Sequence, residues 1–155
     1  MKLRYCLNIS ILFLSVILMF ACQKECDHLP VSRAGLGFYT ISNDQAVKKN
    51  VDSLLIHPVD LPDSIIYAWV KNINFVRLPL SPSVDQTSFV IRLNEFTDTL
   101  MVQYTRQLYY VSEECGFSVN YFIKSLSSTI HGFDSVTIVQ PNVQSVNEEH
   151  IRIYF

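Results

Sequence analysis

Glycine and basic residues are both scarce in this chain. Only 4 of its 155 residues are glycine, and none of them builds the Gly-x-Gly-x-x-Gly loop or the Gly-x-Ser-x-Gly elbow of phosphate-binding proteins and serine hydrolases. Lysine and arginine number 12 against 14 acidic residues, without a basic run, so nucleic acid is not an expected partner. The 4 histidines are scattered rather than grouped at metal-ligand spacing, so no metal or other cofactor is expected.

A long hydrophobic run is also lacking, because the N-terminal one is short for a membrane span. Lys2 and Arg4 precede a mostly apolar stretch, Tyr5 to Ala21, which three polar residues interrupt. A transmembrane helix needs roughly 20 apolar residues. A basic start, an apolar core and a small residue before the cut are typical of a secretory signal. Residues 1–21 are therefore predicted to be a signal peptide, with an uncleaved signal anchor or ordinary cleaved secretion as the alternatives.

The end of this signal resembles the lipobox of bacterial lipoproteins. Ala21 is the small residue before Cys22, which would carry the lipid and become the first residue of the mature chain. More than one acyl chain gives stable membrane anchoring. Gln23-Lys24-Glu25 resembles the signal that sends Bacteroidota lipoproteins to the cell surface; the alternative is a plain polar spacer. We expect a lipid-anchored protein at the outer membrane of a bacterial cell envelope, on its periplasmic or surface face.

Cysteine is scarce enough that its use can be worked out. Of the 4 cysteines, Cys6 leaves with the signal and Cys22 takes the lipid, so Cys26 and Cys115 remain. An oxidising compartment favours a disulfide between these two. Closing a loop of about 90 residues should stabilise the fold by about 4–5 kcal/mol. The alternative is a reactive Cys115, but the two glutamates before it raise a thiol pKa rather than lower it.

The predicted disulfide constrains where the domain sits. Cys26 follows Cys22 by four residues, a reach of about 14 Å at full extension. The sequence therefore predicts a short lipid-attached tether over 22–32 and one domain over 33–155, with the Cys115 corner facing the membrane.

The mature chain has the pattern of an all-β protein. Runs of alternating polarity, rich in β-branched and aromatic residues, recur along it with turn signals between them. We expect an antiparallel β-sandwich, with an immunoglobulin-like Greek key as the first choice and an open barrel as the second. Expected strands are 34–41, 51–56, 73–78, 87–93, 98–105, 108–112, 117–123, 133–139 and 150–155.

Two segments leave the expected strands less certain. Arg106-Gln107 is a plausible tight turn between the runs 98–105 and 108–112. Asp63 to Lys71 is the best candidate for a short helical turn, although it is equally compatible with a strand.

Few side chains suggest chemistry. Glu148-Glu149-His150 hints at acid–base catalysis, but adjacent strand residues point to opposite faces, so a solvated turn is the better interpretation. Trp69 and Tyr109-Tyr110 are candidates for an aromatic sugar-binding platform, with core packing as the commoner role for such residues.

One short pattern recurs more often than the composition predicts. An Asp followed by Ser or Thr and then an apolar residue resembles the O-glycosylation signal of Bacteroidota envelope proteins. The alternative is that Asp and Ser favour turns before strands, so that the pattern marks strand starts. The candidate acceptors are Ser53, Ser64, Thr99 and Ser135.

Taken in order, several individually weak motifs resemble a family of small Bacteroidota envelope lipoproteins of unknown function. The resemblance covers nearly the whole mature chain, and it implies an envelope lipoprotein with two cysteines and no assigned catalytic residues. The motifs are Cys26, Gly37-Phe38-Tyr39, Leu78-Pro79-Leu80, Asp98-Thr99-Leu100 leading to Tyr104, Cys115-Gly116, Asn120-Tyr121 and His150-Ile151-Arg152-Ile153.

The leading hypothesis is a non-enzymatic binding or structural accessory module of the cell envelope. It would be held to the membrane by its N-terminal lipid and would contact an envelope protein or a glycan. The alternatives are a glycan-binding module that uses exposed aromatic residues, and an envelope hydrolase whose residues converge only in three dimensions.

Overall fold

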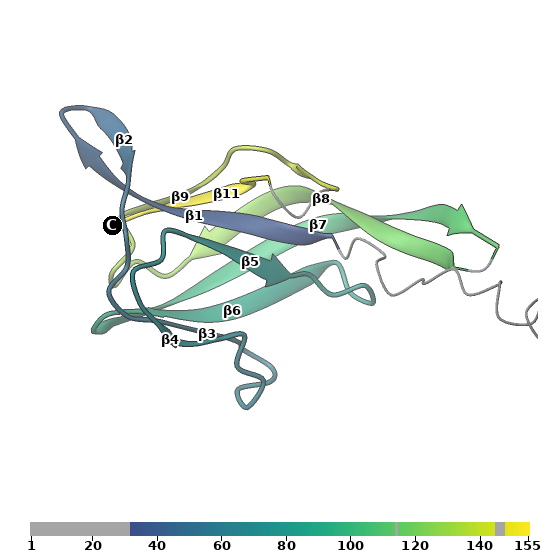
Figure 1. The fold of residues 1–155 in the computed structure, drawn as a ribbon, viewed down its shortest axis with the longest axis horizontal. Helices are drawn as coiled ribbons and strands as arrows, with labels where there is room; N and C mark the ends of the chain where they lie inside the picture. Colours follow the sequence, from purple (N-terminus) through teal and green to yellow (C-terminus); the bar gives the residue numbers. More distant parts are fainter. Residues whose placement is uncertain (1–31, 114, 145–147) are drawn as a thin grey trace, which may run out of the picture.

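The computed structural model describes residues 32–113, 115–144 and 148–155. Over these ranges the chain forms strands and no helix (Figure 1). It follows that the described part holds no helix long and apolar enough to cross a membrane. The strands are β1 (Arg33–Ser42), β2 (Gln45–Lys48), β3 (Leu54–Pro58), β4 (Tyr67–Val70), β5 (Phe75–Pro79), β6 (Gln86–Leu93), β7 (Phe96–Ser112), β8 (Gly116–Ser128), β9 (Ser135–Ile138), β10 (Asn142–Val143) and β11 (Ile151–Tyr154).

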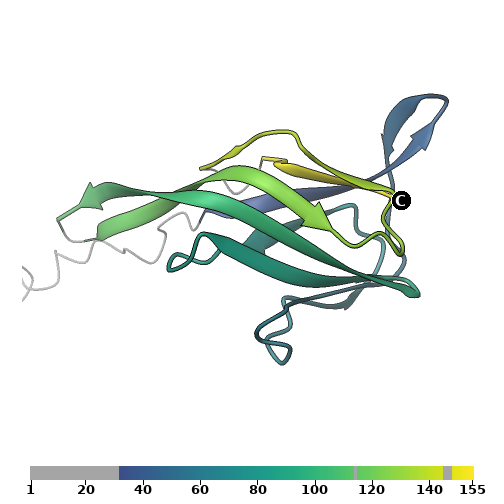
Figure 2. The ribbon, with the colours of Figure 1, turned by 180° about the vertical axis from the view of Figure 1, so that it is seen from behind.

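The strands form two sheets that lie in two layers (Figures 1 and 2). One sheet has the order β2-β1-β11-β9, with β5 also paired to β1, and the other has the order β10-β8-β7-β6-β3-β4. Neighbouring strands run antiparallel except β1 and β11, which are parallel, with Leu36 opposite Ile151. The predicted all-β, sandwich-like class is confirmed, and this parallel pair departs from a purely antiparallel pattern.

The core lies between the sheets, and alternation along the strands decides which side chains enter it. On β6, Phe89 and Ile91 are fully buried, and on β7 so are Leu100 and Val102. Successive side chains of a strand point to opposite faces, so the residue between each of these buried pairs faces outward and is only half-buried. Each such full burial stabilises the fold by about 1.5–3 kcal/mol. The faces expected for 87–93 and 98–105 are confirmed.

The expected turn at Arg106-Gln107 is wrong. β7 continues through it as a single strand of 17 residues, and it stays paired with β8 until Ser112 lies opposite Gly116. Neither residue has a conformational preference that forces a turn, and across the pair Arg106 lies opposite Tyr121. As a result, β7 and β8 form one long hairpin that projects beyond the rest of the sandwich (Figures 1 and 2).

Two short strands, β4 and β2, were not clearly predicted by the alternation of apolar and polar residues. Within Asp63–Lys71 the strand interpretation is confirmed, because β4 pairs with β3 there, with an irregular register and a positive φ of 50° at Trp69. β2 was not expected. All four of its residues are exposed, and its sequence has no alternation of apolar and polar residues that would indicate a strand. It follows a tight turn at Asn43 and Asp44, which both have positive φ, the conformation that asparagine and aspartate tolerate best.

Candidate interaction site

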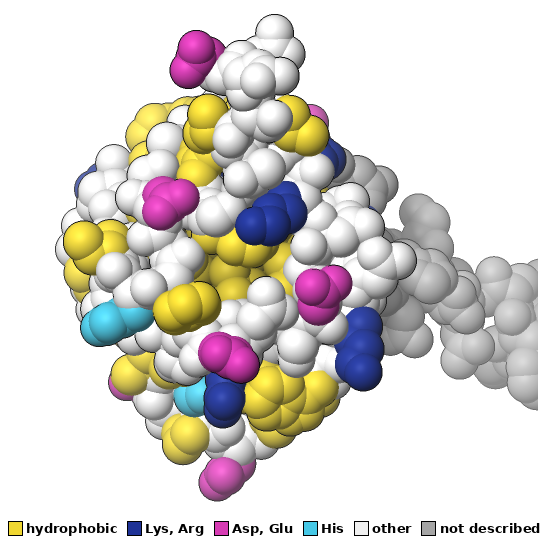
Figure 3. Space-filling view, turned by 90° about the vertical axis from the view of Figure 1, so that its left-hand side faces the viewer, with side chains coloured by type: hydrophobic (Ala, Val, Ile, Leu, Met, Phe, Trp, Pro, Cys, Tyr) yellow, Lys and Arg dark blue, Asp and Glu magenta, His cyan; other side chains and the backbone are white. Residues whose placement is uncertain are grey.

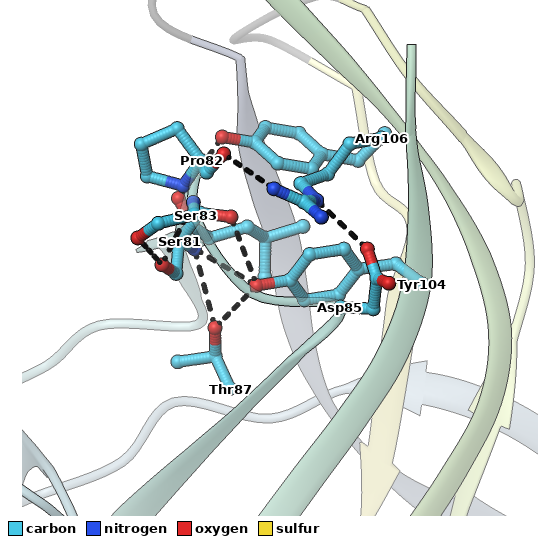
Figure 4. Close-up of polar contacts among 9 residues, drawn as sticks. Ser81, Pro82, Ser83, Asp85, Thr87, Tyr104 and Arg106 are labelled. Carbon is cyan, nitrogen blue, oxygen red and sulfur yellow. Dashed lines mark hydrogen bonds and ion pairs between the residues drawn. The ribbon is translucent and has the colours of Figure 1, made fainter.

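The first part of the candidate site is a loop that Tyr104 fastens to β7. The Tyr104 ring is buried, and its hydroxyl lies 2.6 Å from Thr87 Oγ1. The same hydroxyl accepts the Ser81 N–H at 2.9 Å and donates to the Ser81 carbonyl at 3.2 Å (Figure 4). Tyr121 adds a second fastening, because its hydroxyl donates to the Leu80 carbonyl at 3.0 Å. Two tyrosines from the hairpin thus fix the segment between β5 and β6.

Arg106 joins the same loop to the base of the hairpin. Its Nε donates to Asp85 Oδ1 at 2.7 Å, and its Nη1 donates to the Pro82 carbonyl at 2.9 Å (Figure 4). The Asp85 side chain is 65% exposed, so water screens this ion pair and its role is positional. Arg106 therefore closes the corner between the loop and the projecting hairpin.

Two shallow, open hollows flank this corner. The larger, of about 570 Å³, is lined by charged, polar and apolar residues from the loop, the segment after β3, and strands β6, β7 and β8. The smaller, of about 400 Å³, lies between Pro82 and the hairpin residues Leu108 and Val119. Residues of the larger hollow are Asp60, Val84, Asp85, Gln86, Gln103, Tyr104 and Lys124. A single lysine among exposed acids and amides suits contact with a surface better than enclosure of a small ligand.

The second part of the site is an apolar surface on the hairpin. Leu108 lies opposite Val119, and Tyr110 lies opposite Phe117, so all four side chains share one face. By alternation from Tyr104 this is the face that fills the core farther along β7. We call these four residues the hairpin stripe.

The hairpin stripe is exposed although it continues the core face. Leu108 is 73% exposed, Phe117 67% and Tyr110 55%. The Tyr110 and Phe117 rings meet edge to face, with centroids 5.6 Å apart, and Val119 is packed against the core. The stripe is thus an extension of the hydrophobic core beyond the point where the second sheet covers it.

The opposite end of the molecule has a different surface. Figure 3 shows apolar side chains near the centre of that end, with separated charged side chains around them. Lys49 illustrates this mixing, because its Nζ lies 4.3 Å from the centroid of the Phe155 ring. The exposed apolar side chains of this end are therefore interspersed with charges, unlike those of the hairpin stripe.

The predicted lipid and disulfide residues fall mainly outside the described residues. Cys22 and Cys26 both lie outside them, so lipidation and the Cys26–Cys115 bridge stay predictions. Cys115 itself stands at the hairpin turn, half-buried, with its N–H donated to Ser112 Oγ at 3.1 Å. The reactive-cysteine alternative, like the bridge, stays a hypothesis.

The four candidate glycosylation acceptors lie apart in the fold. Ser64 and Ser135 are exposed, whereas Ser53 and Thr99 are half-buried. The alternative that the pattern marks strand starts fits Ser53, just before β3, and Ser135, which begins β9. It does not fit Thr99, which lies inside β7. Modification of any of the four stays a prediction.

The candidate aromatic platform does not assemble. Trp69 lies on β4 at the edge of its sheet, whereas Tyr109 and Tyr110 lie on the projecting part of the hairpin (Figure 1). Trp69 is half exposed and stacks under the Arg92 guanidinium, 5.2 Å from its ring centroid. The core-packing alternative is also wrong for Trp69 and Tyr110, because both are exposed.

The Glu148-Glu149-His150 segment is structural rather than a solvated turn. His150 is fully buried, and its Nδ1 accepts the Gly35 N–H at 2.8 Å. Glu149 instead accepts from the Tyr39 hydroxyl at 2.9 Å and from Arg152 Nε at 2.6 Å. The solvated-turn interpretation is therefore wrong for both residues, although they do point to different partners as expected.

The pKa directions in this segment follow from burial and these partners. Burial lowers the pKa of His150, and this outweighs nearby backbone groups that favour the protonated ring. For Glu149, burial alone would raise the pKa, but the Arg152 and Tyr39 hydrogen bonds lower it below its ordinary value. A neutral His150 and an ionised Glu149 are thus held in separate environments, which does not make an acid–base pair.

Asp98 is a buried carboxylate, and it holds the loop after β8. It accepts the backbone N–H groups of His131, Gly132 and Phe133, together with the Thr129 hydroxyl. Burial alone would raise the pKa of Asp98, but these hydrogen bonds outweigh it and lower the pKa. All of the carboxylate's bonding capacity is thus used by the loop.

Metal-ligating residues do not gather in the part of the chain that the structure describes, where no group of three or more His, Cys, Asp or Glu could hold an ion. His57 bonds the Pro58 carbonyl, and His131 bonds Asp98. His150 is buried in the core, directly before β11.

The comparisons with known proteins give a family. The chain matches the description "Family of unknown function (DUF6452)" over residues 53–155, which is more than half of its length. The chain belongs to this family. The match begins just before β3 and includes the whole hairpin, whereas β1 and β2 precede it. No curated protein and no solved structure matches the chain.

Sequence reasoning missed the hairpin stripe. The signal for it was present, because Leu108 and Tyr110 continue the alternation of Leu100, Val102 and Tyr104. The expected turn at Arg106-Gln107 separated these residues into two short strands and hid the continuous face.

Proposed function

We propose that this protein is a lipid-anchored module of the bacterial cell envelope that works by binding rather than by catalysis. The observation that carries the proposal is the hairpin stripe. It is a contiguous set of exposed apolar side chains on an element that projects from the sandwich, and such surfaces mark interaction sites. The corner closed by Arg106 and Asp85 supports the base of this surface.

The use of the buried carboxylates supports binding over chemistry. Asp98 is occupied by a loop, and Glu149 is occupied by Arg152 and Tyr39. A catalytic acid or base needs a position within hydrogen-bond reach of a substrate. These two side chains are instead enclosed by partners from the protein itself.

The anchor and the disulfide are part of the same proposal. Cys22 carries the lipid, and Cys26 pairs with Cys115 at the hairpin turn. What supports the pairing is the cysteine count of the mature chain, which leaves Cys26 and Cys115 as the available pair once Cys22 is acylated. A secreted domain of this kind typically keeps such a pair oxidised.

Site-specific photocrosslinking in the native envelope tests the binding surface. A photoreactive amino acid at Leu108 should capture an envelope component, whereas the same residue at Ile41, 59% exposed near the end of β1, should not. Equal capture from both positions, or none from Leu108, would contradict the proposal.

Acylation is tested on the same protein. Metabolic labelling with a clickable fatty acid should label the wild type and not Cys22→Ala, and the variant should leave the membrane fraction. A Cys22→Ala protein that stays membrane-bound through its intact N-terminus would show a signal anchor instead.

A further inference from the structure

We infer that the hairpin stripe docks on the surface of the lipid bilayer to which the chain is anchored, so that the domain lies against the membrane in one orientation. The inference rests on the proposed lipid anchor and names the partner of the surface proposed above. It is carried by the direction from which the chain enters the domain, by the residue types of the stripe and by its charge.

The chain enters the sandwich beside the hairpin. Ser32, the first described residue, is buried, and its Oγ donates to Asn120 Oδ1 on β8 at 3.1 Å. Ten residues separate Cys22 from Ser32, a reach of at most about 33–36 Å. Phe117 lies three residues from Asn120 along the same strand, about 10 Å away. A bilayer that holds the lipid of Cys22 is therefore within reach of the stripe.

The side chains of the stripe suit the boundary between water and hydrocarbon. Leu108 and Phe117 are purely apolar, while Tyr110 adds a ring with a polar tip, and aromatic residues of this kind concentrate at membrane interfaces. The edge-to-face packing of Tyr110 and Phe117 holds the two rings as one surface before any contact is made. Little side-chain ordering is then needed when the surface docks.

Charge sets how the hairpin approaches. Between Gln107 and Asn120 the only charged residues of the sequence are Glu113 and Glu114. Glu113 lies at the turn, where a carboxylate opposes insertion turn first, so the hairpin lies on its stripe instead. The basic residue next to the stripe, Arg106, is already paired with Asp85, so the contact is apolar and added salt should not release it.

The anchor removes the need for strong intrinsic affinity. Once the lipid is inserted, the stripe and the bilayer share one small volume, so docking is an intramolecular step at high effective concentration. Three exposed apolar side chains are then enough to fix an orientation, although they would not recruit a free protein to a membrane.

Brominated lipids test the docking directly. The mature lipidated protein is placed in zwitterionic phosphatidylcholine vesicles whose acyl chains carry bromine, which quenches tryptophan at short range. The native Trp69, on the distant β4, serves as one reporter in the wild type. The double variant Trp69→Phe/Phe117→Trp places the only tryptophan in the stripe. Trp69→Phe/Phe122→Trp is the matched control, because Phe122 is also exposed on β8 but lies on its opposite face.

Tryptophan at position 117 should lose roughly half of its emission in brominated relative to plain vesicles, since an interfacial ring lies close to the acyl chains. Tryptophan at 69 or 122 should change little, and 0.5 M salt should change none of the three. Thermal melting of each variant checks that it is folded.

Each other outcome overturns the inference at a known step. If the protein floats with the vesicles but position 117 is not quenched, the anchor stands and the stripe faces another partner, such as a protein. Equal quenching at all three positions would show insertion without orientation. Failure to float with the vesicles would overturn the proposed anchor together with the docking.

Discussion

Asp98 binds the backbone of Gly132, whose N–H it accepts at 2.7 Å through Oδ2. Gly132 has no room for a side chain, because a Cβ there would stand 2.4 Å from Phe96 Cβ. The carboxylate and the glycine thus fix the loop between β8 and β9 against the start of β7. This loop decides where β9 joins its sheet, so the pair links the two layers of the sandwich.

Asp98→Asn should destabilise the protein by about 2–3 kcal/mol, because a charge-assisted acceptor is replaced by an amide that faces several N–H donors. Urea unfolding at pH 7 measures the change. Asp134→Asn is the matched control, since Asp134 is exposed and precedes a serine in the same short pattern. A loss of similar size in both variants would contradict the structural role of Asp98.

His150 should make stability fall as the pH is lowered. Burial lowers its pKa below the ordinary 6.5, so the unfolded chain takes up a proton first as the pH falls below about 6.5. The free energy of unfolding then decreases by up to about 1.4 kcal/mol per pH unit, until the pH reaches the pKa of the folded state. Urea unfolding at pH 7.5 and 5.5 measures this slope.

His150→Asn supplies the comparison for that slope, because its Oδ1 occupies the position of the histidine Nδ1. The amide oxygen can still accept the Gly35 N–H, but the side chain does not titrate in this range. The variant should therefore be less pH-dependent than the wild type over these two units. An unchanged slope would assign the pH dependence to another group.

Tyr104→Phe should loosen the loop between β5 and β6. The substitution removes the hydroxyl that bonds Thr87 and both backbone groups of Ser81, at a cost of about 1–2 kcal/mol. Hydrogen exchange of the Ser81 amide should accelerate more than that of core amides. Tyr109→Phe is the control, because no hydrogen bond of that hydroxyl is found among the described residues. Equal protection of Ser81 in both variants would be inconsistent with the clamp.

Alternation predicted the buried faces of β6 and β7 because one face of each strand meets a single continuous core. It failed at Arg106, where the inward face leaves the core. There the side chain turns to Asp85 and Pro82, contacts made by a loop 21 to 24 residues earlier in the chain. No local pattern records a partner at that distance.

The candidate site was less predictable than the fold for the same reason. His150 looked like a polar residue at a strand start, yet the Gly35 N–H that it satisfies lies 115 residues away. The hairpin stripe is made of ordinary strand residues, and it is distinguished only by its exposure, because the second sheet does not cover it. The pairing of Cys26 with Cys115, in contrast, was predicted from the number of cysteines in the sequence alone. It gives the last prediction.

The mature protein should contain no titratable thiol before reduction. Cys22 carries lipid in the proposed state, and Cys26 is paired with Cys115 at the hairpin turn. Two thiols in the denatured, non-reduced protein would contradict the pair. Reduction should lower the free energy of unfolding by up to about 4–5 kcal/mol, since the bridge closes a loop of about 90 residues.

Cys26→Ser and Cys115→Ser should match the reduced wild type, because either one opens the same loop. If only Cys115→Ser is destabilised, the role of Cys115 is local to the turn, where its N–H meets Ser112 Oγ, and the bridge does not hold the hairpin turn near the anchored N-terminus.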